Sequence, residues 1–114
     1  LNRAQLPGRP DDLSNLMIYD FETDEVTLVH PGVVQQAGLR SPSEGLADYL
    51  PSGHIMVEEE NSGRILIIAP DGTLAAEFIN SGSDGKAYHL GWSRYIGQED
   101  GDVIRQAVDG VDCS

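Results

Sequence analysis

The feature that most constrains this chain is a series of short apolar runs separated by turn sequences. The run at 26–29 alternates between apolar and polar residues, which is typical of a strand with one buried face. Turn-forming residues such as Pro51-Ser52-Gly53 and Asp71-Gly72 stand between the runs. The pattern predicts strands at 16–21, 26–29, 45–50, 54–59, 64–69 and 74–79. The expected fold is therefore all-β and built from antiparallel hairpins, with 64–69 buried on both faces.

The remaining segments are less regular. Residues 1–14 and 33–43 are predicted to be loops, and 87–96 a long aromatic strand followed by a turn at 97–101. Val103 to Val108 fits a strand or a short helix, and we favour the strand. Residues 15–108 are then the folded segment, between an N-terminal arm at 1–14 and a C-terminal tail at 109–114.

The charge balance limits the possible partners. The chain of 114 residues carries 19 acidic and 7 basic side chains, for a formal charge of −12. This argues against nucleic acid, which needs a basic surface to neutralise phosphates, and against anionic membranes. No apolar run approaches the roughly 20 residues of a membrane-spanning helix. Apolar residues make up 39% of the chain, which is low for a free-standing core.

The hairpins repeat along the chain. The hairpin at 18–32 recurs at 67–82, and the turn region at 49–55 recurs at 95–103, with offsets of roughly 40–50 residues. A four-stranded unit with this period is typical of a β-propeller blade. With strands labelled a to d from the axis outward, the chain contains c-d, then a-b-c-d, then a-b. The alternative is a small antiparallel sandwich that closes by itself.

An incomplete propeller has a physical consequence. A blade buries its faces only against neighbouring blades, so about two blades leave two apolar faces exposed. We therefore expect contact with further blades, a partner protein or copies of this chain. Because the sequence starts at Leu1 rather than Met, we expect a cleaved product or part of a longer polypeptide. The single cysteine, Cys113, is either free or bridged to another chain.

Residues 43–96 resemble a known family. Gly45 to Glu59, read GLADYLPSGHIMVEE, resembles the strand–turn–strand block of bacterial arylsulfotransferase-like propeller proteins. The stretches GRIL at 63–66, PDGTL at 70–74 and EFIN at 77–80 resemble the following hairpin, and DGK at 84–86 with WSRY at 92–95 resembles the C-terminal end. The chain departs from the family at Ala75-Ala76, where a tryptophan is common, and lacks the N-terminal blades.

The resemblance implies a possible chemistry. Such enzymes are periplasmic and move sulfate between phenols through a sulfated histidine, without a nucleotide cofactor. It implies a periplasmic or extracellular location and a phenolic sulfate ligand, and the chemistry needs His and Arg near the propeller axis. His89, at the start of the last predicted strand, is the candidate nucleophile, and Arg94 is the candidate anion clamp. Strand residues five apart face opposite sides, so a bulge would be needed to bring both to one sulfate. The alternative for His89 is a packing or surface residue, and His30 and His54 are expected in loops or turns.

Other candidates are open to two interpretations. Tyr88, Trp92 and Tyr95 could stack a ligand or anchor a partner, or pack between blades. Glu58-Glu59-Glu60 suggests a solvated strand edge rather than a metal cluster, because neighbours point to opposite faces. The acidic run at 99–102 fits a calcium loop or an ordinary turn, and the Gly-rich 81–85 precedes no helix and indicates no phosphate site.

Three functions follow from these observations. The first is a non-catalytic propeller segment that serves as a scaffold or interaction subunit, covered by further blades or a protein partner. The second is the C-terminal part of an arylsulfotransferase-like enzyme. The third is a module that binds a carbohydrate or another small ligand. Neither a metal nor a cofactor is predicted.

Overall fold

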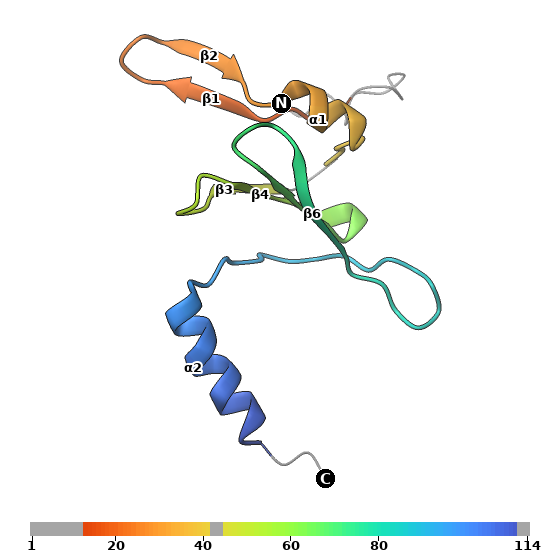
Figure 1. Ribbon diagram of the computed structural model, residues 1–114. Helices are drawn as coiled ribbons and strands as arrows, with labels where there is room; N and C mark the ends of the chain where they lie inside the picture. The colour runs from red at the N-terminus through yellow and green to blue at the C-terminus, as the bar shows by residue number, and fades with distance from the viewer. Residues whose placement is uncertain (1–12, 42–44, 112–114) are drawn as a thin grey trace.

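Two antiparallel sheets form the chain, as the computed structural model in Figure 1 shows for the described residues, 13–41 and 45–111. Strands β1 (Met17–Asp20) and β2 (Glu25–Leu28) pair as a two-stranded sheet. The second sheet has four strands that are neighbours in chain order: β3 (Gly45–Tyr49), β4 (Ile55–Glu59), β5 (Arg64–Ile68) and β6 (Leu74–Ile79). The six strands predicted between residues 16 and 79 are thus confirmed, each within a residue or two at its ends.

Helix α1 (Pro31–Gln36) occupies a segment that was predicted to be a loop. Pro31 stands at its start, where its fixed φ and missing N–H are favourable. Gly38, with a φ of 63°, ends it in the left-handed conformation. The prediction for 33–43 was therefore wrong for its first residues, and residues 42–44 lie outside the described part.

Helix α2 (Gln98–Asp109) replaces the turn and the strand predicted at 97–108. Val103, Ile104 and Val108 favoured a strand, but Glu99 and Asp100 lie in the first turn, where carboxylates interact well with the positive end of the helix dipole. The helical alternative was correct, and the favoured strand was wrong.

The segment 87–96 is extended but is not the predicted long strand. Only Ala87 makes a β-bridge among its described residues, to Ser81. Trp92 has a φ of 59°, which interrupts an extended backbone. Residues 95–103 consequently do not form the predicted a-b hairpin, and the repeat is limited to the hairpins β1–β2 and β5–β6.

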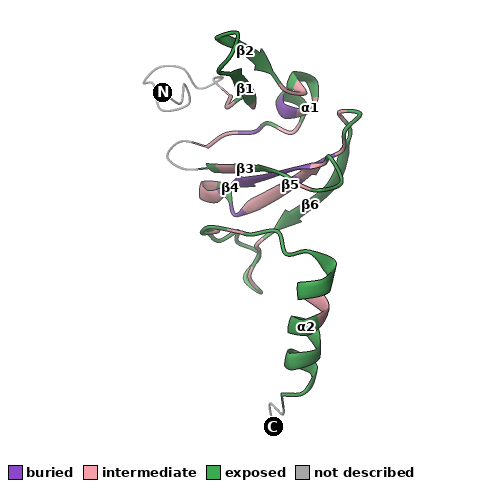
Figure 2. Cartoon of the chain, turned by 90° about the vertical axis from the view of Figure 1, so that its left-hand side faces the viewer, coloured by how far each residue is buried: buried purple, intermediate pink, exposed green. Residues whose placement is uncertain are grey.

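The core lies on one face of the four-stranded sheet. Cross-strand pairing places Ile55 beside Ile68 and Val57 beside Leu66, and all four side chains are buried. Val34 of α1 and Leu39 pack against them. Figure 2 shows this buried layer between the sheet and α1. On β5 the alternate residues Ile65 and Ile67 are only half-buried, so the strand is not buried equally on both faces.

The molecule is extended for its size. Its Cα radius of gyration is 16.7 Å, whereas a compact chain of this length has a value of about 13 Å. A three-turn helix that packs on neither sheet contributes to this shape: α2 has no buried residue and projects from the end of the 87–96 segment (Figures 1 and 2). No helix in the described ranges is long and apolar enough to cross a membrane.

Candidate functional site

Two adjacent glutamates on β4 are buried on opposite faces of the sheet. Glu58 is 3% exposed and Glu59 is 2% exposed. β4 lies between β3 and β5, so its alternate residues face the two sides of the sheet rather than a free edge. The prediction of a solvated strand edge was therefore wrong. Buried carboxylates need hydrogen-bond donors, and each glutamate obtains them from a different segment.

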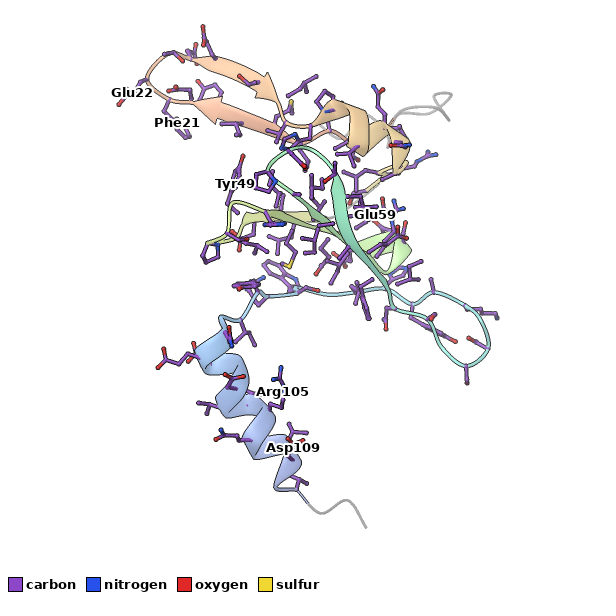
Figure 3. The ribbon with its side chains drawn as sticks, in the orientation of Figure 1. Phe21, Glu22, Tyr49, Glu59, Arg105 and Asp109 are labelled. Carbon is purple, nitrogen blue, oxygen red and sulfur yellow. The ribbon has the colours of Figure 1, made fainter. Side chains whose placement is uncertain are left out.

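Glu59 attaches the 37–41 segment to the core face. Its Oε2 accepts hydrogen bonds from the backbone N–H of Arg40 at 2.6 Å and from Nη2 of Arg64 at 3.0 Å. Arg64 is the cross-strand neighbour of Glu59 on β5, and its Nη1 donates to the carbonyl of Ala37 at 2.9 Å. Figure 3 shows Glu59 on the side of the sheet that faces α1. This buried ion pair has a structural role.

Glu58 holds residues 87–96, the aromatic segment, on the face of the sheet opposite the core. Its Oε1 accepts from the backbone N–H of Trp92 at 3.1 Å, and its Oε2 accepts from that of Ser93 at 2.6 Å. Two successive N–H groups next to a left-handed residue form a concave anion-binding nest, which a carboxylate of the chain occupies here. Glu58 of β4 thus fixes the position of the backbone at Trp92 and Ser93.

The start of the aromatic segment is fixed by close backbone contacts. The N–H of Tyr88 donates to the carbonyl of Asn80 at 2.8 Å, and Nδ2 of Asn80 donates to the carbonyl of Tyr88 at 3.2 Å. Gly63 has a φ of 61°, and a Cβ at this position would overlap the Tyr88 carbonyl oxygen. Glycine is required at position 63 both for its conformation and for this close approach.

The predicted catalytic pair lies in solvent-exposed positions. His89 and Arg94 are both exposed. The guanidinium of Arg94 lies 5.4 Å from the centre of the Trp92 ring, and its Nη1 donates to the Ser93 carbonyl at 3.1 Å. The structure therefore brings Arg94 to Trp92 rather than to His89. Their roles as clamp and nucleophile remain predictions.

The three predicted binding aromatics are exposed to different degrees. Trp92 is 71% exposed, and Tyr88 and Tyr95 are about half exposed. The hydroxyl of Tyr88 donates to Oδ2 of Asp84 at 2.5 Å, which raises the pKa of Tyr88 and lowers the pKa of Asp84. Within residues 13–41 and 45–111, Trp92 and Tyr95 thus present ring surface that is open to solvent.

The other candidates have local roles. Nδ1 of His54 lies 2.8 Å from Oγ of Ser52 in the turn before β4, and His30 precedes the first residue of α1. The acidic run at 99–102 is the first part of α2, where Asp102 pairs with Arg105 at 3.4 Å. Among the described residues, no three His, Cys, Asp or Glu side chains are grouped as metal ligands. Cys113 lies outside the described residues.

Large apolar side chains remain exposed on every element outside the core. Eighteen such residues in the described ranges are exposed, whereas seven hydrophobic residues are buried, six of them in the core cluster. The exposed residues lie on both strands of the β1–β2 hairpin, on β3, on β6, along 88–96 and on α2. Isolated exposed apolar residues are normal, whereas large contiguous apolar patches mark interaction surfaces in proteins generally.

No family model, curated protein or solved structure matches this chain. Its function must therefore be inferred from the exposed surfaces and the anchored aromatic segment.

The buried glutamates are the residues that the sequence interpretation missed. A signal was present, because 54–59 is both preceded and followed by a predicted strand at hairpin spacing. A strand in that position is an inner strand, and carboxylates on an inner strand must face donors from segments above and below the sheet.

Proposed function

We propose that this chain is a non-catalytic interaction subunit, built around one propeller-type blade, whose apolar surfaces are covered by further blades or by a partner protein. A propeller ring completed by such blades and a periplasmic or extracellular location belong to the same proposal, and both rest on the sequence resemblance.

The observation that carries the proposal is the size of the exposed surface. The accessible surface is 8140 Å², whereas a compact monomer of 12.3 kDa exposes roughly 6100 Å². The excess of about 2000 Å² is larger than the roughly 800 Å² that each partner buries in a standard protein interface. A chain with this much additional accessible surface, and with large apolar side chains exposed on it, is expected to associate.

The four-stranded sheet supports the blade interpretation. Its strands follow one another in chain order, as strands a to d of a blade do. All six residues of β6 are exposed, including Leu74, Phe78 and Ile79. Register places Phe78 beside Ile65 on the face opposite the core, so this strand offers apolar side chains on both faces of the sheet. Neighbouring blades would cover them.

The test is the mass of the native assembly. The protein isolated from its source should be part of a longer polypeptide, found by intact mass and N-terminal sequencing, or of a stable complex, found by native mass spectrometry. Phe78→Glu should weaken that assembly, whereas Glu77→Gln on the same exposed strand should leave it intact. A monodisperse 12.3 kDa monomer that binds no hydrophobic dye would refute the proposal.

Catalysis is tested on the same material. The assembly should not transfer sulfate from p-nitrophenyl sulfate to a phenol. Turnover that His89→Ala abolishes and His54→Ala retains would replace the non-catalytic assignment with the arylsulfotransferase-like one.

A further inference from the structure

We propose that α2 is a docking helix, and that its apolar stripe enters an apolar groove with a basic rim on a partner protein. The inference deepens the proposed function, on which it rests, by assigning one surface to a partner of stated chemistry.

The stripe is defined by the helical repeat. Val103, Ile104, Ala107 and Val108 are spaced at i, i+1, i+4 and i+5, which places them on one side of α2. Val111, two residues after the helix ends, is also exposed. Val103 and Val108 are both 63% exposed, and no residue of the helix is buried. The described chain therefore leaves the whole stripe open to solvent.

The stripe needs a cover if α2 is to persist as a helix. An isolated helix of fewer than about 12–15 residues is marginal in water, and most helical stability in proteins comes from packing of the apolar face. The exposed pair between Asp102 and Arg105 contributes little by itself. Figure 3 shows side chains around α2, Arg105 and Asp109 among them, with neither sheet beside them.

Charge selects the partner. Four carboxylates and one cation lie on α2, and the cation, Arg105, is already paired with Asp102. Glu99 and Asp100 lie at the N-terminal end of the stripe, where they would meet the rim of a groove. A rim of Lys and Arg complements them. A second copy of this chain would instead bring together two molecules that each carry a formal charge of −12.

The experiment places a photo-crosslinking amino acid in the full chain, expressed in its source cells. The probe stands at Ile104 in the stripe, at Gln106 outside it, or at Phe78 on the sheet. The Ile104 probe should give an adduct with another protein, in clear excess over Gln106. The partner peptide should line an apolar groove with Lys or Arg beside it. Yield should fall when salt is raised in the lysate, because exposed charges are screened.

Variants test the stripe directly. With the probe at Ile104, Val108→Asp should lower the adduct yield about tenfold or more, because it places a charge in the apolar contact. Gln106→Asp adds the same charge outside the stripe and should preserve the adduct.

Each other outcome overturns the inference. These outcomes are an adduct with a second copy of this chain, an adduct at an acidic or salt-insensitive site, equal yields at Ile104 and Gln106, or no adduct at Ile104. An adduct from Phe78 without one from Ile104 would remove the docking helix and keep the proposed interaction subunit. If neither the Phe78 probe nor the Ile104 probe gives an adduct, both the docking helix and the proposed interaction subunit are refuted.

Discussion

Replacing Glu58 with glutamine should release the aromatic segment from the sheet while the sheet stays folded. The substitution preserves the volume of a side chain that is only 3% exposed. It removes the charge and leaves one acceptor oxygen for the N–H groups of Trp92 and Ser93, while the new amide NH₂ faces the second N–H. Trp92 then loses the anion that holds its left-handed backbone.

The magnitude follows from the two hydrogen bonds. A hydrogen bond to a charged group contributes about 1.5–3 kcal/mol, and a neutral one about 1 kcal/mol. Because both hydrogen bonds are only partly buried, the lower value applies. Two bonds of about 1.5 kcal/mol are replaced by one of about 1 kcal/mol, a loss of about 2 kcal/mol, which corresponds to a roughly 30-fold larger opening equilibrium.

The assay is amide hydrogen exchange with tryptophan fluorescence as a second probe. Exchange at Trp92 and Ser93 should accelerate roughly 30-fold in Glu58→Gln, while the amides of β5 retain their protection. Trp92 is the only tryptophan, so its emission reports on the same segment. Glu77→Gln makes the same charge change on exposed β6 and should alter neither signal. Less than a threefold change at both amides, or an equal change throughout the sheet, would refute the anchoring role of Glu58.

Three further predictions concern stability and titration. Arg64→Met should destabilise the fold by about 3–5 kcal/mol in urea denaturation, because it leaves a buried carboxylate without its cation. Gly63→Ala should cost about 3 kcal/mol or more, since it adds left-handed strain and a backbone overlap. Gly85→Ala, which has a φ of 76° and open space around it, should cost only about 1 kcal/mol. Tyr88→Phe should raise the pKa of Asp84 toward its ordinary value in an NMR titration, because it removes the hydroxyl donor.

The outcomes that contradict these predictions differ. An equal loss of stability in Gly63→Ala and Gly85→Ala would show that the Tyr88 carbonyl can move away from an added Cβ at little energetic cost. For Asp84 the sign is fixed by linkage: its pKa is lowered in the folded state, so its contribution to stability is present above about pH 4 and is lost as the pH falls through the folded-state pKa. An unchanged titration in Tyr88→Phe would mean that the Lys86 N–H, the other donor to Asp84, controls the shift.

The hairpins could be predicted because their signals are local. Asp71-Gly72 places a left-handed glycine in the β5–β6 turn, and Oδ1 of Asp71 accepts from the N–H of Thr73 at 3.0 Å. Asp20 accepts from the N–H of Glu22 at 2.8 Å in the β1–β2 turn in the same way. Each of these turn hydrogen bonds joins residues only two positions apart. In the strands between the turns, the alternation of side chains specifies which residues share a face. Strand order in the four-stranded sheet follows directly from short connections.

The segment 87–96 could not be predicted by the same rules, since its conformation depends on a residue far away in sequence. The aromatic residues of this segment favoured a strand, but the N–H groups of Trp92 and Ser93 bond to a carboxylate 34 and 35 residues earlier. Beyond Ala87 and Tyr88 the segment belongs to no strand of a sheet, so Trp92 and Tyr95 have no sheet to alternate across. The expectation that His89 and Arg94 lie on opposite faces assumed strand periodicity, and this segment is not a strand.

Strand order would have corrected the reading of the three glutamates. Alternation alone establishes that Glu58 and Glu59 face opposite sides, and it says nothing about burial. Once 54–59 is placed between two hairpin partners, both sides of it belong to the interior of a sheet, and each carboxylate must recruit donors from a covering segment. One layer is then required from before the sheet in sequence and one from after it, which the 37–41 and 87–96 segments provide. A pair of adjacent carboxylates on an inner strand therefore indicates two covering segments, and the aromatic surface of this chain is positioned by one of them.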